Sequence, residues 1–236
     1  MGASLALSLR NVAETLAISS PTVVEALFGR VTKATCDQRL QSWAEACLRN
    51  ARIELALSGS EHMARGRTYL VMSNHQSLYD IPVLFHVIGP NLRMIGKKEL
   101  FRVPVFGHAM TAAGFVEIDR SDRNAAIRSL QRARDMLSGG THVWIAPEGT
   151  RSPTGELLPF KKGAFYLALE TQFPILPVTV QGTRNVLPAH GLLSTAGKTV
   201  RVTIHAPIDP GPYTALGKSG RSQLMSDVRA TIEAGL

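Results

Sequence analysis

The chain has 236 residues, enough for one domain or for one domain with a helical appendage. Hydrophobic residues make up 44%, which excludes a disordered chain, and 26 lysines and arginines against 18 acidic residues give a formal net charge of +8. An excess of this size predicts an anionic partner, whether nucleic acid, lipid headgroups or a phosphorylated substrate, without choosing among them. Cys36 and Cys47 form no C-x-x-C pair and no disulfide framework, so we interpret them as structural thiols in a reducing compartment.

Residues 1–51 are predicted to be helical. The segment SLALSLRNVAETLAI is apolar, with charges only at Arg10 and Glu14. A second helix is expected in SSPTVVEALFGRV, with Ser20 as its cap and Pro21 in its first turn. A third segment, DQRLQSWAEACLRNAR, carries an apolar helix face formed by Leu40, Trp43, Ala44, Cys47 and Leu48.

Two interpretations of this N-terminal segment are open. It is either a helical subdomain packed on the rest of the chain or an anchor lying in the plane of a membrane, because apolar helices with basic residues suit a bilayer interface. We expect no transmembrane span, since the apolar stretch TLAISSPTVV has ten residues where about 20 are needed. We also expect no secretory signal, because a basic region leading into an apolar segment and a cleavage site is absent.

From residue 52 onward, strand-like and helical segments alternate. The strand-like segments are RIELAL, TYLVMS, LRMIG, GFVEID, HVWIAP, ILPVTVQG and VRVTIHAPI. The clearest helix is SDRNAAIRSLQRARDMLSGG, beginning at Asp122 and ending at Gly139, with an apolar side formed by Ile127, Leu130, Ala133 and Leu137. A last helix is expected in KSGRSQLMSDVRATIEAGL. The alternation predicts an α/β fold with a central mixed sheet flanked by helices. We therefore divide the chain into a helical segment, 1–51, and an α/β domain, 52–236.

The stretch SNHQSLYD places His75 and Asp80 five residues apart, after the apolar run YLVM. The apolar IPVLFHVI that follows predicts a helix beginning near Ser77 or Leu78. Two helical residues five apart point about 140° away from each other, so contact requires His75 to lie in the loop before the helix. Asp80 in the first turn would then orient the imidazole, the role of the acid in a catalytic triad. This spacing also occurs by chance in many chains, so the pair alone does not establish catalysis.

A second polar stretch, IAPEGTRS, follows another strand-like segment. Gly149 allows the backbone to approach a ligand closely, and Arg151 offers a planar fork for phosphate or carboxylate. Glu148 is expected either to accept hydrogen bonds from hydroxyl groups or to orient the arginine. A solvated turn with a surface ion pair fits the same residues, so both interpretations stay open at this point.

Taken together, six stretches resemble the motif blocks of one family. NHQSLYD, GKKELFRVPVFG, GFVEIDR, PEGTRS, LLPFKKGAF and ILPVTV occur in this order between about residues 68 and 183. They resemble the glycerolipid acyltransferases, specifically the 1-acylglycerol-3-phosphate (lysophosphatidate) O-acyltransferases. The resemblance implies transfer of a fatty acyl chain from acyl-CoA or acyl-carrier protein to the free hydroxyl of lysophosphatidate, forming phosphatidate in phospholipid biosynthesis.

The resemblance also implies a role for each motif residue. His75 would be the general base on the acceptor hydroxyl, oriented by Asp80, and Pro177 lies in a block associated with the acyl donor. The acceptor phosphate would be bound by Lys97, Lys98, Arg120, Glu148, Gly149 and Arg151. Attack of a hydroxyl on a thioester needs one base and no covalent intermediate, so we expect no metal and no cofactor besides the acyl thioester as co-substrate.

Two alternatives accompany this interpretation. The same motifs fit acyltransferases acting on another lysolipid, such as a lysophospholipid or a lyso-amino-acid lipid. A non-enzymatic basic module that binds lipid or nucleic acid fits the charge, but it would not need His75 and Asp80. The basic runs also lack the interleaved aromatic residues of single-strand binders, so we expect no nucleic-acid partner.

The resemblance favours a membrane role for residues 1–35. We expect a peripheral or monotopic protein on the anionic, cytoplasmic face of a membrane. The tryptophans, Trp43 and Trp144, are expected in the core. An acyl groove and ordinary core packing are both compatible with Leu100, Phe101, Val105 and Phe106.

Overall fold

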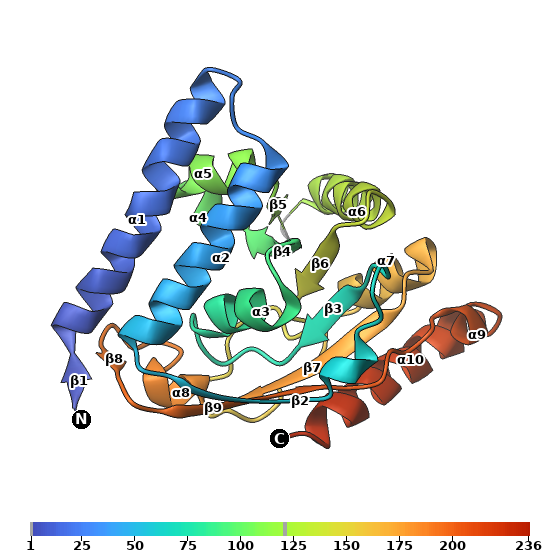
Figure 1. Cartoon of the computed structure of the whole chain (residues 1–236). Helices are drawn as coiled ribbons and strands as arrows, with labels where there is room; N and C mark the ends of the chain where they lie inside the picture. The colour runs from blue at the N-terminus through green and yellow to red at the C-terminus, as the bar shows by residue number, and fades with distance from the viewer. Residues whose placement is uncertain (1, 120–121) are drawn as a thin grey trace.

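A seven-stranded mixed sheet forms the centre of the fold in the computed structural model, which describes residues 2–119 and 122–236 (Figure 1). The strand order is β2-β9-β7-β3-β6-β4-β5. β7, β3, β6, β4 and β5 are parallel, whereas β9 is antiparallel to β7 and parallel to β2. The strands are β2 (Glu54–Ser58), β3 (Leu70–Ser73), β4 (Leu92–Lys97), β5 (Val116–Ile118), β6 (His142–Ile145), β7 (Ile175–Gln181) and β9 (Thr199–Ile204). Each of the segments expected as strands contributes to this sheet, which confirms the α/β fold with a central mixed sheet.

The central strand β3 shows why the sheet has helices on both faces. Leu70 and Met72 pack into the core on one face, and Val71 packs into the core on the other. Successive side chains of a strand point to opposite faces, so a strand that is covered on both sides is a continuous apolar run. The predicted strand TYLVMS has this composition.

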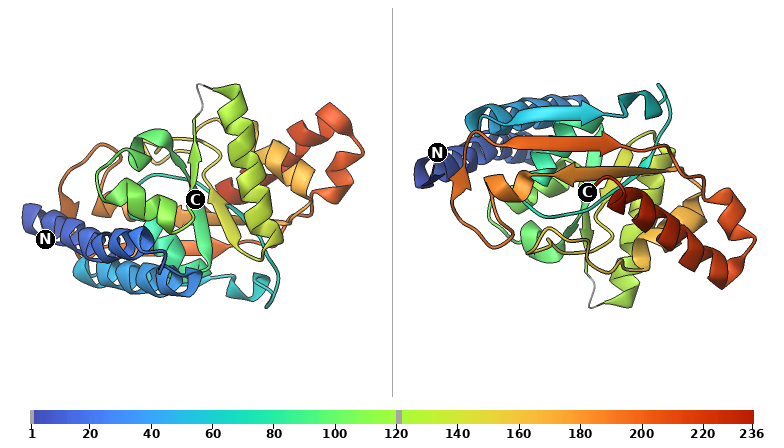
Figure 2. Two further views of the ribbon diagram at one scale, coloured as in Figure 1. Left: turned by 90° about the horizontal axis from the view of Figure 1, so that it is seen from above. Right: turned by 90° about the horizontal axis from the view of Figure 1, so that it is seen from below.

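The helices form two layers on the sheet. α2 (Lys33–Asn50), α3 (Asp80–Ile88) and α5 (Phe106–Ala112) contribute to the core on one face, and α6 (Arg123–Ser138), α7 (Gly163–Thr171) and α10 (Gly217–Glu233) to the core on the other. Figure 2 shows α1 and α2 on the side of the sheet opposite α10. The short helical turns are η1 (Ser60–His62), α4 (Lys98–Phe101), α8 (Thr183–Val186) and α9 (Gly211–Thr214).

The predicted helix limits of α6 are confirmed, but one of its core residues is not. The Asp122 side chain caps the helix by accepting from the backbone N–H of Asn124 at 2.8 Å, and Gly139 ends it. Ala133 and Leu137 are buried, whereas Ile127 is 45% exposed. At about 100° per residue, Ile127 lies roughly 90° from the mean direction of the other three apolar residues. It therefore falls at the border of the buried stripe.

α2 has the predicted apolar face. Leu40, Ala44 and Leu48 are buried in the same core as β3 and β7, and Trp43 packs against that core. Cys36 and Cys47 are free thiols and both are buried. α2 is thus packed directly on the sheet layer.

α1 (Leu5–Leu27) is one continuous helix, so the predicted break at Pro21 is wrong. Proline removes a backbone N–H from the helix. Arg39 of α2 donates to Thr22 Oγ1 at 3.0 Å and to Glu25 Oε1 at 2.6 Å, so α2 holds the part of α1 that follows the proline. α1 packs on α2 and α5, outside the layer that covers the sheet (Figure 1). In the described part of the chain, every helix is too short or too polar to cross a membrane.

The start of α1 is fixed to a distant loop. β1 (Ala3–Ser4) pairs antiparallel with β8 (Ser194–Thr195), and the backbone N–H of Ser194 donates to Ser8 Oγ at 2.8 Å. The N-terminal end of α1 is therefore tied to the chain segment that follows α8.

Candidate active site

The polar motifs meet at one edge of the sheet. β7, β3, β6 and β4 are adjacent parallel strands, so their carboxyl ends lie side by side. His75 follows β3, Glu148 follows β6, and Lys97 ends β4. In open α/β sheets this edge is where ligands bind.

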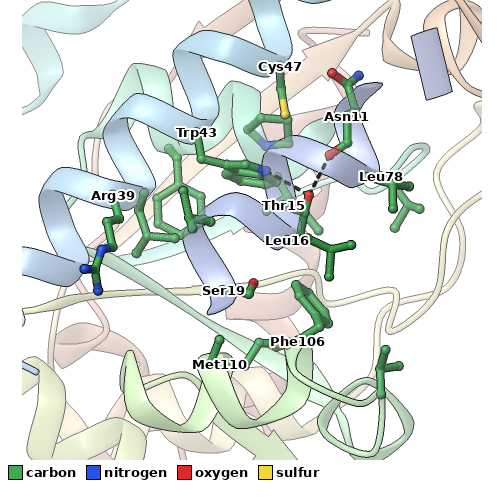
Figure 3. A pocket seen from close by; sticks show the side chains of 18 of the residues that line it. Asn11, Thr15, Leu16, Ser19, Arg39, Trp43, Cys47, Leu78, Phe106 and Met110 are labelled. Atoms are coloured by element: carbon green, nitrogen blue, oxygen red, sulfur yellow. Dashed lines mark hydrogen bonds between the residues drawn. The ribbon is translucent and has the colours of Figure 1, made fainter. Parts of the chain in front are cut away.

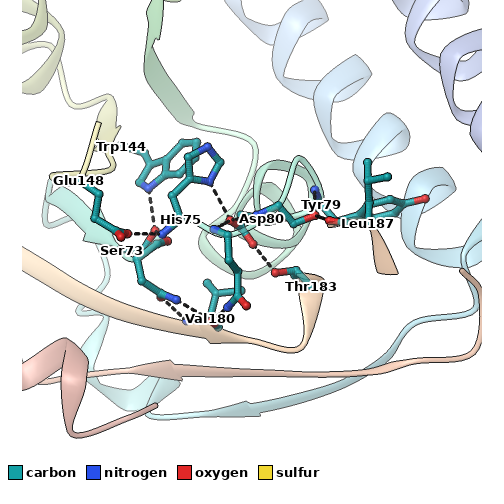
Figure 4. A network of polar contacts seen from close by, with 12 residues as sticks. Ser73, His75, Tyr79, Asp80, Trp144, Glu148, Val180, Thr183 and Leu187 are labelled. Carbon is teal, nitrogen blue, oxygen red and sulfur yellow. Dashed lines mark hydrogen bonds and ion pairs between the residues drawn. The ribbon is translucent and has the colours of Figure 1, made fainter. Parts of the chain in front are cut away.

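His75 lies in the loop between β3 and α3, and its ring contacts Asp80, as expected (Figure 4). The distance from His75 Nδ1 to Asp80 Oδ2 is 2.7 Å. α3 begins at Asp80, two to three residues later than predicted from the apolar pattern. The Asp80 side chain is completely buried, whereas that of His75 is 17% exposed. The pair therefore has a protected acid and an accessible imidazole.

The Asp80 carboxylate is surrounded by donors. Oδ2 also accepts from the backbone N–H groups of Gln76 at 2.7 Å and Ser77 at 2.9 Å, and Oδ1 accepts from the hydroxyl of Thr183. The amino end of α3 adds the favourable end of the helix dipole. An ionised carboxylate only accepts, so His75 Nδ1 carries the proton and Nε2 has the free lone pair. Among the described residues, no group forms a hydrogen bond to Nε2.

The loop after β6 holds the backbone of His75 on both sides. The N–H of His75 donates to Glu148 Oε1 at 2.7 Å, and its carbonyl accepts from the N–H of Ser152, also at 2.7 Å. Glu148 Oε2 accepts from the N–H of Leu158 at 2.8 Å. Burial raises the pKa of the Glu148 carboxyl, while the two backbone N–H groups act in the opposite direction. Gly149 has a φ of 73°, which favours glycine and permits this tight turn.

Of the two roles expected for Glu148, the structure gives no contact with Arg151 within the described residues. Both of its oxygens accept from backbone N–H groups, and the residue is 2% exposed. In the described part of the chain it makes neither an ion pair nor a hydrogen bond with Arg151. Glu148 therefore positions the loop of His75, and its contact with the acceptor stays a prediction.

The expected phosphate-binding residues differ in their surroundings. Arg151 is partly exposed and has no hydrogen bond or ion pair within the described residues, and Lys97 is exposed at the end of β4. Lys98 Nζ lies 2.7 Å from Asp119 Oδ2, so its charge is paired. Arg120 lies outside the described residues. Phosphate binding by these residues stays a prediction.

Pro177 lies away from this edge. It is buried in the middle of β7, opposite Met72 of β3, and its carbonyl accepts from the N–H of His205 at 3.0 Å. Its position is that of a sheet residue, and nothing in these contacts connects it to the acyl donor.

Two further residues hold the His75 loop and were not identified as site residues from the sequence. The Asn74 side chain donates to the carbonyl of Val180 and accepts from its N–H, each at 2.8 Å, which joins the loop to β7. Trp144 is buried, as expected, but it also packs edge-on against His75, with ring centroids 5.6 Å apart, and donates to Ser73 Oγ at 2.9 Å. Local sequence gives no signal for these contacts, because the partners lie far apart in the chain.

A mainly apolar cavity of about 480 Å³ opens beside the His75 loop, between α1, α2, α3 and α5 (Figure 3). Leu78 and Tyr79, which directly precede Asp80, line it together with Leu16, Trp43 and Phe106. Among the four residues considered for an acyl groove, only Phe106 lines this cavity, whereas Leu100 and Phe101 pack against the core. The cavity is lined by residues of α1 and α2 together with residues of α3, α5 and the loops beside them, and an acyl groove here stays a prediction.

Asn11 of α1 reaches into the same region and its amide donates to the Tyr79 hydroxyl at 2.5 Å. α1 is therefore bonded to the residue that precedes Asp80. In the described part of the chain, no group of three or more His, Cys, Asp or Glu residues is arranged to bind a metal ion.

Comparison with known proteins gives consistent results. A family model described as Acyltransferase matches residues 54–181. A chloroplastic 1-acyl-sn-glycerol-3-phosphate acyltransferase of Brassica napus is 39% identical over 64% of this chain and 44% of the relative. The alpha form of the enzyme from Mus musculus is 31% identical over 78% of this chain and 67% of the relative. The chain spans about half the length of several of the curated relatives that it matches.

A solved structure is similar over nearly the whole fold. The crystal structure of the 1-acyl-sn-glycerophosphate acyltransferase PlsC from Thermotoga maritima has a TM-score of 0.75 and 27% sequence identity, covering 97% of this chain and 95% of that one. The family match covers all the motif residues discussed above, from His75 to Pro177. This chain belongs to the acyltransferase family.

Proposed function

We propose that this chain transfers a fatty acyl group from a thioester, either acyl-CoA or acyl-carrier protein, to the free hydroxyl of lysophosphatidate, forming phosphatidate. The observation that carries the proposal is the His75–Asp80 pair, with Nδ1 bound to a buried carboxylate and an imidazole side chain that is 17% exposed. The choice of lysophosphatidate as the acceptor follows the names of the similar proteins, which are 1-acylglycerol-3-phosphate acyltransferases.

The proposed reaction steps follow from the tautomer of the His75 imidazole, with its proton on Nδ1 and a free lone pair on Nε2. His75 Nε2 takes the proton from the acceptor hydroxyl as its oxygen attacks the thioester carbonyl. The tetrahedral intermediate collapses with cleavage of the C–S bond, and the imidazolium returns the proton to the departing thiolate. Asp80 holds the ring in the tautomer with a free Nε2 and stabilises the imidazolium. No oxidant, reductant or metal ion is needed to balance these steps.

The acceptor phosphate is proposed to bind near Arg151. This guanidinium follows β6, next to the strand that carries His75, and it is partly exposed. Arginine binds phosphate through two parallel N–H groups, which fixes the orientation of the ligand as well as its position. Lys97 at the end of β4, the next strand along the sheet, supplies a second exposed cation.

The acyl chain is proposed to occupy the cavity beside Tyr79. Its lining is mainly apolar, and it lies directly next to the residues that precede Asp80. Burial of methylene groups from water stabilises binding by about 0.8 kcal/mol per group. A long apolar chain therefore has a strong preference for such a cavity over water.

The exposed apolar side chains of α1 and of the residue that follows it are proposed to lie in a bilayer interface. Leu5, Leu9, Leu27 and Phe28 are 59–80% exposed, although they are large and apolar. Leu192, in a loop next to β8, is 85% exposed. Exposed apolar residues gathered on one helix mark an interaction surface, and a lipid acceptor makes a membrane the natural partner.

The proposed function is tested by incubating purified protein with radiolabelled acyl-CoA, or with acyl-carrier protein bearing the same chain, and a panel of lysolipids in mixed vesicles. Labelled phosphatidate should form with lysophosphatidate and should be absent with the His75→Ala variant. A series of chain lengths from about 10 to 20 carbons then measures the acyl preference. Acylation of another lysolipid in place of lysophosphatidate would replace the proposed acceptor. Absence of transfer to every lysolipid tested would overturn the proposal.

A further inference from the structure

The two oxygens of the Asp80 carboxylate have unequal sets of partners. Oδ2 accepts from His75 Nδ1 and from two backbone N–H groups of the same loop. Oδ1 has one described donor, the hydroxyl of Thr183. Asp80 and Thr183 are both 0% exposed, so water does not replace this donor.

Thr183 comes from a different part of the fold. It is the first residue of α8 and follows β7, the strand next to β3, and it lies 103 residues from Asp80 in the chain. Gly182 precedes it with a φ of 89°, and a Cβ at that position would lie 2.4 Å from the carbonyl oxygen of Thr199. Only glycine fits this turn, and the turn brings the backbone of Thr183 to the position from which its hydroxyl reaches Asp80.

We propose that Thr183 is a positioning residue for the reaction. Its hydroxyl fixes the rotation of the Asp80 carboxylate, and through that carboxylate it fixes the orientation and tautomer of the His75 imidazole. The reason is geometric: rotation about the Cβ–Cγ bond moves both oxygens, so the donor at Oδ1 adds to the restraint that the donors at Oδ2 impose, and without it Oδ1 would be a buried acceptor with no described donor. Thr183 itself touches neither the ring nor the reacting atoms. The activity readout rests on the proposed acyl transfer.

The test compares Thr183→Val, which keeps the shape and removes the hydroxyl, with Thr183→Ser, which keeps the hydroxyl. Thr179→Val is the matched control, because Thr179 is a buried threonine of β7 whose hydroxyl bonds to the carbonyl of Ile232 and not to Asp80. Thr183→Val should lower kcat about 10- to 100-fold, the rate equivalent of one charge-assisted hydrogen bond, with KM for both substrates nearly unchanged. Thr183→Ser should restore kcat to within about threefold.

A spectroscopic readout separates positioning from a loss of stability. The Nδ1 proton of His75, observed by NMR in ¹⁵N-histidine-labelled protein and assigned by its absence in His75→Gln, reports its hydrogen bond to Asp80. Its resonance should shift or broaden in Thr183→Val and stay unchanged in Thr179→Val. If Thr183→Val does not fold, Thr183→Cys takes its place, and its weaker donor should give an intermediate kcat.

Each outcome decides the proposal. A folded Thr183→Val or Thr183→Cys protein with wild-type kcat and an unchanged Nδ1 resonance overturns it. Failure of Thr183→Ser to restore kcat also overturns it, because the methyl group would then matter instead of the hydroxyl. Loss of kcat in Thr179→Val to the same extent would assign the effect to general destabilisation. If wild-type protein shows no acyl transfer, the proposed function fails, while the NMR comparison still tests the contact.

Discussion

Glu148 fixes the backbone of His75 from 73 positions further along the chain, with its Oε1 accepting from the His75 N–H at 2.7 Å. Its Oε2 accepts from the N–H of Leu158 at 2.8 Å, so one buried side chain joins two loops. His75 is thus held at its ring by Asp80 and at its backbone by Glu148.

The first prediction is that Glu148→Gln lowers both stability and kcat. A glutamine NH₂ group must face either the His75 N–H or the Leu158 N–H, and a buried donor facing a donor costs about 1–3 kcal/mol. We expect a matching loss in the free energy of unfolding, measured with urea, and a fall in kcat of at least tenfold as the loop shifts. Glu156→Gln, an exposed residue of the same region, is the control and should change neither. Unchanged kcat in the folded Glu148→Gln protein contradicts the role given to Glu148.

The second prediction concerns the base. His75→Ala should fold and lose at least about 10²-fold in kcat, because general-base catalysis contributes 10²–10⁴-fold. Asp80→Asn should lose less activity, since the imidazole remains, but also stability, because a neutral amide oxygen replaces the carboxylate that accepts from the buried N–H groups, and hydrogen bonds to a charged group are stronger. The control is His86→Ala on the exposed side of α3, which should retain full turnover. Near-normal turnover in a folded His75→Ala protein rules out this mechanism.

The third prediction concerns the acceptor phosphate. Arg151→Ala should raise KM for lysophosphatidate about 10- to 100-fold, since a hydrogen bond to a charged group contributes about 1.5–3 kcal/mol. If the contact tightens in the transition state, kcat falls as well. Because CoA also carries phosphates, KM for the acyl donor should be measured in parallel and should change little. Arg128→Ala, an exposed arginine of α6, serves as the control for net charge. Unchanged kinetics would place the phosphate elsewhere.

The fourth prediction concerns the membrane. Replacing Leu9, Leu27 and Phe28 of the exposed α1 surface with glutamine should reduce partition onto anionic vesicles at least about tenfold at roughly 0.5 M salt, where screening suppresses charge adsorption. These side chains do not line the cavity, so the soluble fold should be retained. Vesicle sedimentation measures the effect, with Leu57→Gln on β2 as the control for an exposed apolar residue elsewhere. Equal binding of both variants would place the membrane contact outside α1.

The fifth prediction concerns pH and stability. His142 Nδ1 accepts from the N–H of Tyr69 at 3.1 Å, and burial, with a smaller effect of Lys33, lowers the pKa of His142 below 6.5. As the pH falls, the His142 imidazole is therefore protonated in the unfolded chain before it is protonated in the folded chain. The stability contributed by neutral His142 is present above pH 6.5 and is lost as the pH falls toward the lowered pKa. The loss is at most about 1.4 kcal/mol per pH unit.

His142→Asn isolates the contribution of His142 to the pH dependence of stability. The asparagine oxygen can accept the hydrogen bond from the Tyr69 N–H, but asparagine does not titrate. Urea unfolding at pH 7.5 and at pH 5.5 should show a smaller loss of stability in the variant than in the wild-type protein. The pKa of His205 is also lowered by burial, but that residue is present in both proteins and cancels in the comparison. An identical loss in both proteins would show that His142 does not titrate in this range.

Much of this protein was determined by local sequence. Short apolar segments indicate each strand of the sheet, and Asp122 and Gly139 mark the ends of α6, because strand preference and helix capping act over a few residues. The contact between His75 and Asp80 is also local, since a loop followed by the first turn of a helix brings the two together. These features depend on covalent spacing and so can be recognised before any fold is known.

The tertiary structure alone decided what surrounds that pair. The strand order places β7 and β6 on either side of β3, which brings Thr183 to Asp80 across 103 residues and Glu148 to the backbone of His75 across 73. It also joins Arg39 of α2 to Thr22 and Glu25 of α1, in the part of that helix that continues beyond Pro21. Such contacts depend on the order in which distant strands and helices pack, and no local pattern of apolar and polar residues encodes that order. The sequence determined the contact between His75 and Asp80, and the assembled sheet determined how that pair is held.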